Sequence, residues 1–405
     1  MAVNLPELGV LSPIRGIRIG TARAGIKQTQ RDDLVVMALA SGTRVAGVFT
    51  QSAFKAAPVR ICEDHLSKGE PRAILINSGN ANAATGAAGI EDALQCCRWV
   101  ADSLDVPAKT VLPFSTGVIG QRLPLEKLRQ GIPQASAGLA EAWEGAARAI
   151  MTTDTGPKAL SKKVVIDGVD VTITGIAKGA GMIRPDMATM LAYIGTDAAV
   201  SRDCLSKLVR GAADASFNRI TVDGDTSTND SFILMATGAA GNSVIESEQH
   251  TGYATLRDGV FSVARELAQR IIRDAEGATK FVTVVVAGGR RADECLQVAY
   301  TIAHSPLIKT AMFASDPNWG RFCMAIGRAG VDGLEADRVA LYLDDVCVAR
   351  GGMIAPEYTE QAGARVMSQP EFTVRVDLGR GFSEETIWTC DFSYDYVRIN
   401  AEYRT

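Results

Sequence analysis

One segment near the middle of the chain has the residue types of a reactive site. It reads KGAGMIRPDMAT from Lys178 to Thr189, with glycines at 179 and 181 that can adopt backbone conformations closed to other residues. A cut in the peptide bond before Thr189 would free an α-amino group that could act as a base for the threonine hydroxyl. The alternative interpretation is a loop that leads into a buried strand over residues 190–194.

Three further segments are rich in small polar residues. Thr116 and Gly117 follow an expected strand and could offer a hydroxyl and a backbone N–H to an oxyanion, or form an ordinary turn. The loop from Asn77 to Gly86 could hold a polar ligand or satisfy its own polar groups. The segment VDGDTSTND (222–230) has the composition of a calcium loop but lacks the spacing and final glutamate of an EF-hand, so we expect no metal there.

Histidine is scarce, which restricts the catalytic machinery. The chain has three, His65, His250 and His304. We expect His65 on the surface among charged neighbours, and His304 at the C-terminus of a helix, where it meets the helix dipole favourably. No P-loop, dinucleotide-binding, nucleophile-elbow or zinc-protease motif occurs. Serine-type and metal hydrolases are therefore disfavoured.

Composition sets the broad class. The 405 residues carry a net charge of −4, with 47% hydrophobic and 22% charged residues, as in ordinary soluble globular proteins of two or three domains. No basic surface for nucleic acid, no membrane-spanning stretch and no secretion signal is expected. The eight cysteines form no CxxC motif, which is typical of reduced thiols in a cytoplasmic protein.

Strands and helices alternate along the chain. The residue pattern predicts a hairpin over Lys162–Ile176, turning at Asp167-Gly168, and therefore α/β layers with a mixed or antiparallel sheet. Helices are expected over residues 90–104, 135–151, 201–216, 253–273 and 292–303. Strands are expected over residues 34–40, 44–50, 73–77, 111–114, 231–236, 281–287, 338–347 and 372–378, with a β-rich tail over 386–401.

These segments together resemble the ornithine acetyltransferase (glutamate N-acetyltransferase, arginine-biosynthesis J protein) family. The matching pieces occur in the family's order and span nearly the whole chain. They are AGVFT (46–50), NSGNANAATG (77–86), STGVIG (115–120), MTTDT (151–155), KGAGMIRPDMATML (178–191), VDGDTSTND (222–230), DPNWGR (316–321) and the terminus from Asn400 to Thr405.

The resemblance implies a precursor that cleaves itself between Ala188 and Thr189. It gives an alpha chain (1–188) and a beta chain (189–405) that interleave in one core. Thr189 then takes acetyl from N-acetylornithine and passes it to glutamate in a ping-pong cycle, with its own freed amino group as base. Thr116 and Gly117 match the family's oxyanion-hole pair.

The resemblance also implies the substrate contacts. They are Thr152 (with Thr153 adjacent, so that the register is open by one residue), Lys178, Thr189, Glu276, Asn400 and Thr405. Lys178 can pair with a substrate carboxylate and Glu276 with an amino group.

The fold implied is a layered α-β-β-α sandwich with a smaller second α/β domain. The family further implies a dimer of alpha-beta units, that is, a heterotetramer. No cofactor or metal is expected. Some members are bifunctional and also accept acetyl-CoA as a co-substrate to make N-acetylglutamate; the sequence leaves this open.

Two alternatives remain beside the acetyltransferase. An N-terminal-nucleophile amidohydrolase or aminopeptidase would also cleave itself, but it would pass the acyl group to water. An amino-acid-binding protein without catalysis would keep an uncut chain.

Overall fold

The structure is a computed structural model that describes residues 2–184 and 190–402. Ala188, Thr189 and Thr405 lie outside these residues. The chain forms two compact units, each described here by itself. The large unit comprises Glu7–Asn218 and Asp225–Ile271, and the small unit comprises the described residues of Met1–Pro6, Arg219–Gly224 and Ile272–Thr405.

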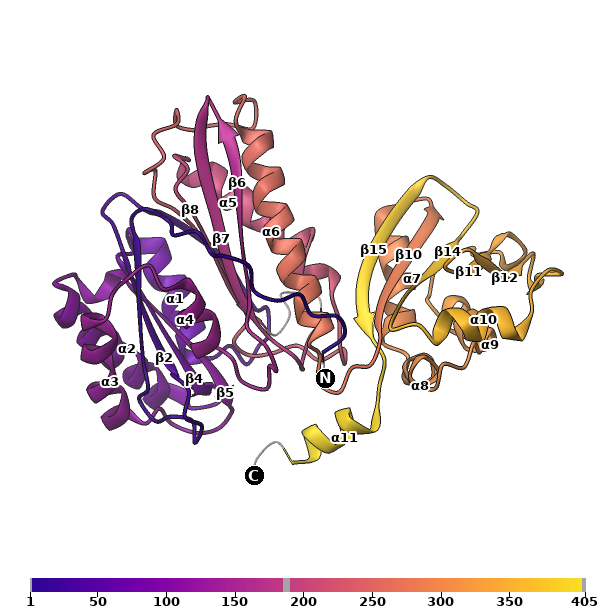
Figure 1. The fold of residues 1–405 in the computed structure, drawn as a ribbon, viewed down its shortest axis with the longest axis horizontal. Coiled ribbons are helices and arrows are strands. Elements are labelled where there is room, and N and C mark those ends of the chain that lie inside the picture. Colours follow the sequence, from indigo (N-terminus) through magenta and orange to yellow (C-terminus); the bar gives the residue numbers. More distant parts are fainter. Residues whose placement is uncertain (1, 185–189, 403–405) are drawn as a thin grey trace. The chain divides into compact units, whose positions relative to one another are not determined.

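The large unit contains two mixed sheets (Figure 1). The first has the strand order β1 (Ile17–Ala22), β2 (Leu34–Leu39), β4 (Ala73–Asn80), β5 (Val111–Val118). The second has the order β3 (Arg44–Phe49), β9 (Ser231–Ala236), β8 (Leu191–Thr196), β7 (Val169–Lys178), β6 (Lys158–Ile166). The pairs β4–β5 and β8–β9 are parallel and the others antiparallel, as the predicted mixed sheet requires.

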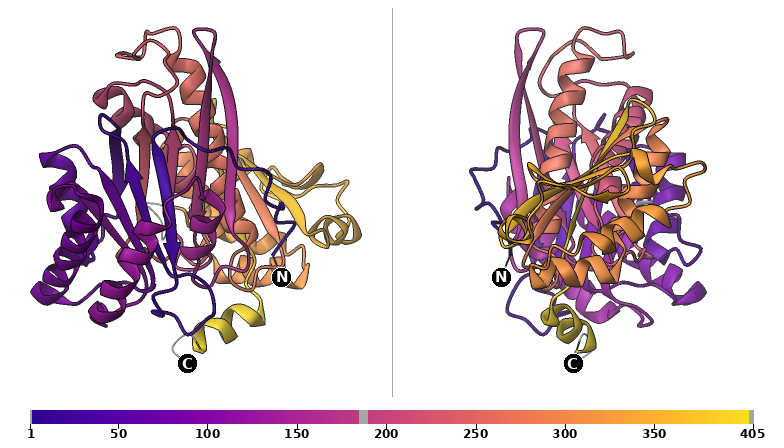
Figure 2. Two further views of the ribbon diagram at one scale, coloured as in Figure 1. Left: turned by 60° about the vertical axis from the view of Figure 1, so that its left-hand side comes forward. Right: turned by 90° about the vertical axis from the view of Figure 1, so that its right-hand side faces the viewer.

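Helices cover the outer face of each sheet, and the inner faces meet in a shared core (Figure 2). Along β2, Leu34 and Val36 face the helices while Val35 and Met37 face the second sheet, because successive strand residues point to opposite faces. The first sheet carries α1 (Ala57–Lys68), α2 (Gly86–Leu104) and α3 (Leu125–Ala137), and the second carries α5 (Arg202–Asp214) and α6 (Tyr253–Arg273). The predicted α-β-β-α sandwich is confirmed.

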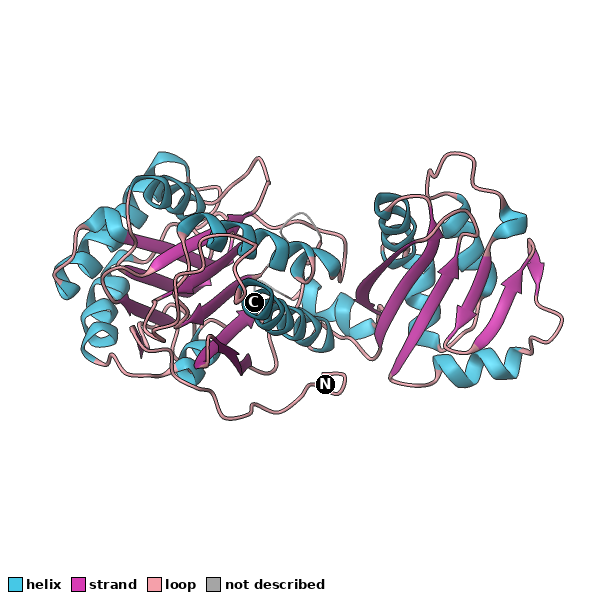
Figure 3. Ribbon diagram, turned by 90° about the horizontal axis from the view of Figure 1, so that it is seen from above, coloured by secondary structure: helices cyan, strands magenta, loops and turns pink. Residues whose placement is uncertain are grey.

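The small unit is a second α/β layer pair (Figure 3). Its sheet order is β13 (Met353–Ile354), β12 (Val346–Arg350), β11 (Ala340–Leu343), β14 (Glu371–Asp377), β10 (Phe281–Gly289), β15 (Ser383–Cys390). One apolar core joins this sheet to its helices. The helices of that core are α7 (Ala292–Ala303), α8 (Pro306–Ala314), α9 (Trp319–Gly327) and α10 (Glu360–Met367). Short 3₁₀ turns cover Ala108–Thr110, Phe217–Arg219 and Ala336–Arg338.

The predicted hairpin is confirmed in detail. β6 and β7 pair antiparallel up to Ile166 and Val169, and the two residues between them, Asp167 and Gly168, both have positive φ, 53° and 77°. Two positive φ angles in a two-residue loop are the signature of a type I′ turn.

Three predicted elements are wrong. The single strand expected over 338–347 is two antiparallel strands, β11 and β12, joined by a turn at Asp344 and Asp345. The helix expected over 135–151 is broken, because α3 ends at Ala137 and Ala140 exchanges backbone hydrogen bonds with Ile19 of β1 before α4 (Trp143–Ala149) begins. Pairing with a strand here overrides the helical propensity of the alanines. The β-rich tail is a strand only to Cys390, and α11 (Tyr394–Ala401) follows, capped by the Ser393 side chain.

The chain on either side of residues 185–189 lies in one sheet. β7 pairs antiparallel with β8, with Lys178 opposite Leu191. Within the described residues, the helices are all too short or too polar to cross a bilayer.

Candidate active site

The predicted oxyanion pair lies near the end of β5. Thr116 is buried, and no hydrogen bond joins its hydroxyl to any other residue described in the structure. Gly117 has φ of 134°, and a Cβ there would lie 2.3 Å from the backbone carbon of Gly79 on β4. The two backbones therefore approach so closely that only glycine fits at 117. The close approach leaves Thr116 and Gly117 in one fixed geometry.

Asn229 ties this strand end to the second sheet. Its side-chain amide donates to the carbonyl of Ser115 at 2.8 Å and to that of Ala81 at 2.7 Å. The next residue, Asp230, accepts from the Met190 amide through Oδ1 at 3.1 Å. Asn229 and Asp230 thus connect the predicted oxyanion pair with Met190, the residue that follows Thr189 in the sequence.

A buried carboxylate organises the neighbouring strand end. Asp154 Oδ1 accepts from Lys158 Nζ at 2.6 Å and from the Gly179 amide at 2.8 Å, and Oδ2 accepts from the Thr152 amide at 2.9 Å. Burial opposes the charge of Asp154, but Lys158 and Lys178 outweigh it and hold the pKa of the carboxyl below its usual range. Asp154 therefore holds two predicted substrate-contact segments together, at Thr152 and beside Lys178.

Two lysines add positive charge beside the carboxylates of this region. Lys178 is buried at the end of β7, where its charge acts on both Asp154 and Asp230. Lys27 Nζ donates to the carbonyl of Met151 at 3.0 Å, and burial, followed by repulsion from Arg31, lowers the pKa of Lys27 to about 8. Such a region suits the carboxylate of an amino acid.

The two predicted residues in the small unit contact each other. Asn400 Nδ2 on α11 donates to Glu276 Oε2 at 2.9 Å, and Glu276 is buried. The predicted site residues therefore form two sets. Thr116, Gly117, Thr152 and Lys178 belong to the large unit, and Glu276 and Asn400 belong to the small unit.

The sequence patterns did not indicate three residues of the candidate site, namely Asp154, Asn229 and Asp230. The last two lie in VDGDTSTND, whose acidic composition drew attention only as a calcium loop, and Asp154 lies in MTTDT. Within residues 2–184 and 190–402, the His, Cys, Asp and Glu side chains form no group of three able to hold a metal ion.

His65 is buried, contrary to prediction. Its Nδ1 lies 2.7 Å from the carbonyl of Val111, so the ring is held inside by a backbone hydrogen bond. His304 ends α7 as predicted and contacts the Thr221 hydroxyl at 3.0 Å.

The loop over residues 77–86 satisfies its own polar groups. Asn77 Nδ2 donates to the Asn80 carbonyl, Asn82 Nδ2 to the Gly89 carbonyl, and the Thr85 hydroxyl to Asn82 Oδ1. Of the two alternatives for this loop, the structure favours the self-satisfied turn.

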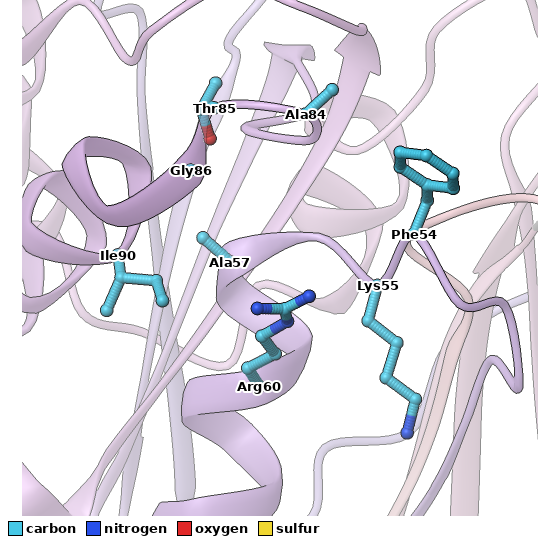
Figure 4. A pocket seen from close by; sticks show the side chains of 8 residues that line it. All are labelled: Phe54, Lys55, Ala57, Arg60, Ala84, Thr85, Gly86 and Ile90. Carbon is cyan, nitrogen blue, oxygen red and sulfur yellow. The ribbon is translucent and has the colours of Figure 1, made fainter.

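A pocket of about 210 Å³ lies where this loop enters α2 (Figure 4). Phe54, Lys55 and Arg60 line one side, and Ile90 lies on the other side. None of the predicted site residues lines this pocket, so it is separate from the site described above.

The fold and site define an α-β-β-α sandwich protein with polar residues gathered at the ends of β5, β7 and β9. The chain belongs to the ArgJ family, whose model matches residues 18–405. Arginine biosynthesis bifunctional protein argJ from Bacillus halodurans is 34% identical, with 52% of this chain and 97% of that chain covered and a TM-score of 0.50. Ornithine acetyltransferase from Mycobacterium tuberculosis, solved with ornithine, is 35% identical, with 44% and 94% covered and a TM-score of 0.38.

Proposed function

We propose that this chain is an ornithine acetyltransferase of arginine biosynthesis, which moves acetyl from N-acetylornithine to glutamate. The observation that carries the proposal is the family match over residues 18–405. It favours a transferase over an amidohydrolase, and over a binding protein without catalysis. The buried Thr116 hydroxyl, which makes no hydrogen bond to the described residues, and the buried charge of Lys178 support the same chemistry.

We propose that Thr189 becomes the nucleophile by self-cleavage. Its hydroxyl oxygen adds to the Ala188 carbonyl, the C–N bond breaks and the nitrogen takes the proton, which leaves an ester. Water hydrolyses this ester to the Ala188 carboxylate, a free hydroxyl and an α-amino group. The argJ chain from Bacillus halodurans supports a cut near the middle, since it is about half as long as this chain. The alpha chain would then be 1–188 and the beta chain 189–405.

In the transfer itself, the α-amino group of Thr189 accepts the hydroxyl proton while the oxygen attacks the acetyl carbonyl. An α-amino pKa near 8 suits this task at neutral pH. The Thr116 hydroxyl and the Gly117 amide stabilise the oxyanion, and ornithine leaves with a proton on its nitrogen. The amino group of glutamate then attacks the acetyl-threonine ester and restores the free hydroxyl.

Substrate binding would divide among the residues named above. Lys178 pairs with the amino-acid carboxylate, Glu276 with an amino group, and Thr152, Asn400 and Thr405 complete the contacts. Acetyl-CoA is a second acetyl donor to be tested, and no cofactor is needed. We expect two alpha-beta units to associate in the cytoplasm.

The experiment joins an intact-mass measurement to an assay with N-acetylornithine and glutamate. We expect two chains in place of one 42.9 kDa species, and equal amounts of ornithine and N-acetylglutamate. Acetate in place of N-acetylglutamate would select the hydrolase. One unbroken, inactive species would overturn the proposal. An assay with acetyl-CoA and glutamate decides the second activity.

A pair of variants tests the nucleophile. Thr189→Ala should remain whole and inactive, while Thr189→Ser, which keeps a hydroxyl, should still cleave. Cleavage or activity of the alanine variant would remove Thr189 from its role.

A further inference from the structure

The last helix, α11, carries Asn400 but buries none of its eight residues. A helix of this length is marginal in water by itself, and α11 gains little from an apolar core. Contacts near its two ends therefore decide where it lies. Ser393 before the helix and Asn400 near its end both bind the turn at Glu276 and Gly277.

Ser393 joins the start of α11 to that turn. Its buried side chain accepts from the Tyr396 amide at 3.3 Å, which caps the helix, and its hydroxyl donates to the Gly277 carbonyl at 2.5 Å. One hydroxyl therefore satisfies an open amide of the helix and fixes the helix to the chain beside Glu276.

Gly277 permits the close approach of the turn and the helix. It has φ of 67°, and a Cβ there would lie 2.4 Å from the Tyr396 nitrogen. Glycine alone fits at this position, because any side chain would push α11 away from the turn.

The segment before α11 is anchored to the same stretch of chain. Asp391 is buried, and its Oδ1 accepts from the backbone amides of Thr279 and Lys280 at 2.8 and 2.9 Å. Its Oδ2 accepts from the Thr279 hydroxyl at 2.6 Å. Asp391 thus fixes where the segment begins, and Ser393 fixes the direction in which α11 leaves it.

That direction matters most at Asn400. Asn400 follows Ser393 by two helical turns, a rise of about 10 Å, so a tilt of about 15° at Ser393 would move Asn400 by about 3 Å. A shift of this size would break the 2.9 Å hydrogen bond from Asn400 to Glu276.

The contact between Asn400 and Glu276 also orients the asparagine. Its amide group donates to Glu276 Oε2 and, at 3.0 Å, to the Tyr396 carbonyl. With the nitrogen engaged in this way, the Asn400 oxygen is the atom that can accept from a ligand. An amide oxygen beside a carboxylate suits an ammonium group, which carries donors only.

We propose that Ser393 is a positioning residue for substrate binding. It docks α11 on the turn, so that the Asn400 oxygen and the Glu276 carboxylate together accept from the free ammonium group of N-acetylornithine. The inference rests on the proposed function, which supplies this substrate. Since an enzyme with α11 docked only part of the time binds with lower apparent affinity, the loss of Ser393 acts on KM and not on kcat.

The test compares the steady-state constants of Ser393→Ala with those of the wild type. KM for N-acetylornithine should rise about tenfold, with kcat within about twofold. Ser393→Thr keeps a hydroxyl and should restore most of the affinity. N-acetylnorvaline has the same carbon skeleton without the terminal amino group, so its inhibition constant should be the same in wild type and Ser393→Ala.

Ser201→Ala is the matched control. Ser201 caps α5 in the same way, accepting from the Cys204 amide at 3.3 Å, but α5 carries none of the predicted site residues. Its replacement removes a cap of the same kind and should leave KM unchanged.

Two results would overturn the inference alone. One is a Ser393→Ala enzyme that keeps the wild-type KM. The other is an equal loss of affinity for N-acetylornithine and N-acetylnorvaline, which would show that the whole site is disturbed and not the ammonium contact. Wild-type protein that moves no acetyl from N-acetylornithine overturns the proposed function instead.

Should Ser393→Ala not fold, hydrogen exchange in the wild-type protein decides. Saturating ornithine, which carries the same ammonium group, should slow exchange of the α11 amides and leave those of α10 as they were. Exchange in α11 that ornithine does not change would contradict a substrate contact that depends on the docked helix.

Discussion

Asp154 and Lys158 form an ion pair with both side chains fully buried, 2.6 Å apart between Oδ1 and Nζ. The same carboxylate binds the backbone amides of Thr152 and Gly179, so the pair also fixes two segments of the proposed substrate site. Burial of such a pair costs the desolvation free energy of both charges. The Coulomb attraction and the additional hydrogen bonds offset this cost.

Asp154→Asn should destabilise the large unit by about 3–5 kcal/mol, because it removes the negative charge opposite a buried lysine. Denaturant unfolding measures the change. Asp64→Asn, in the exposed pair of Asp64 with Lys68, is the control and should cost no more than about 1 kcal/mol. An equal loss of unfolding free energy in the two variants would show that the buried ion pair contributes no more to stability than the exposed one.

Gly117→Ala should lower the stability by at least about 2 kcal/mol and abolish acetyl transfer. The new methyl group would meet the backbone of Gly79, and the φ of 134° is unfavourable for any side chain. Gly69→Ala is the control, since a Cβ there meets nothing within 4 Å and φ is not left-handed. Thermal unfolding compares the two, and a Gly117→Ala protein as stable as Gly69→Ala would contradict the close approach of β4 and β5.

Thr116→Ala should lower kcat by about 10²–10³, with a smaller effect on KM, because the lost donor acts on the oxyanion rather than on the bound substrate. Steady-state kinetics with N-acetylornithine measure both constants. Thr110→Ala, in the 3₁₀ turn that precedes the same strand, where the half-buried side chain donates only to the Pro107 carbonyl, should behave as the wild type. A kcat within about threefold of the wild-type value would remove the Thr116 hydroxyl from the oxyanion hole.

Much of the fold could be predicted from local patterns. The turn at Asp167-Gly168 could be predicted because a type I′ turn needs two residues that tolerate positive φ. The broken helix at 138–142 was not, since its cause is pairing with Ile19, far away in the sequence. His65 was also misjudged, because the carbonyl that holds it belongs to Val111 on another element.

The site shows the same division. Thr116, Lys178 and Glu276 could be predicted as site residues because their motifs resemble those of a known family. Asn229 and Asp230 take their roles from the order of the strands, which places β9 between β3 and β8. A composition such as VDGDTSTND carries no sign of which backbone groups its side chains will meet.

The pairing of β7 with β8 has a consequence for how the mature protein assembles. A cut between residues 188 and 189 would turn neighbouring strands of one sheet into strands of two polypeptides. Neither chain would hold a complete hydrophobic core, so each would need the other in order to stay folded. Their one-to-one ratio would be set at synthesis, and separately expressed halves would have no folded monomer from which to start.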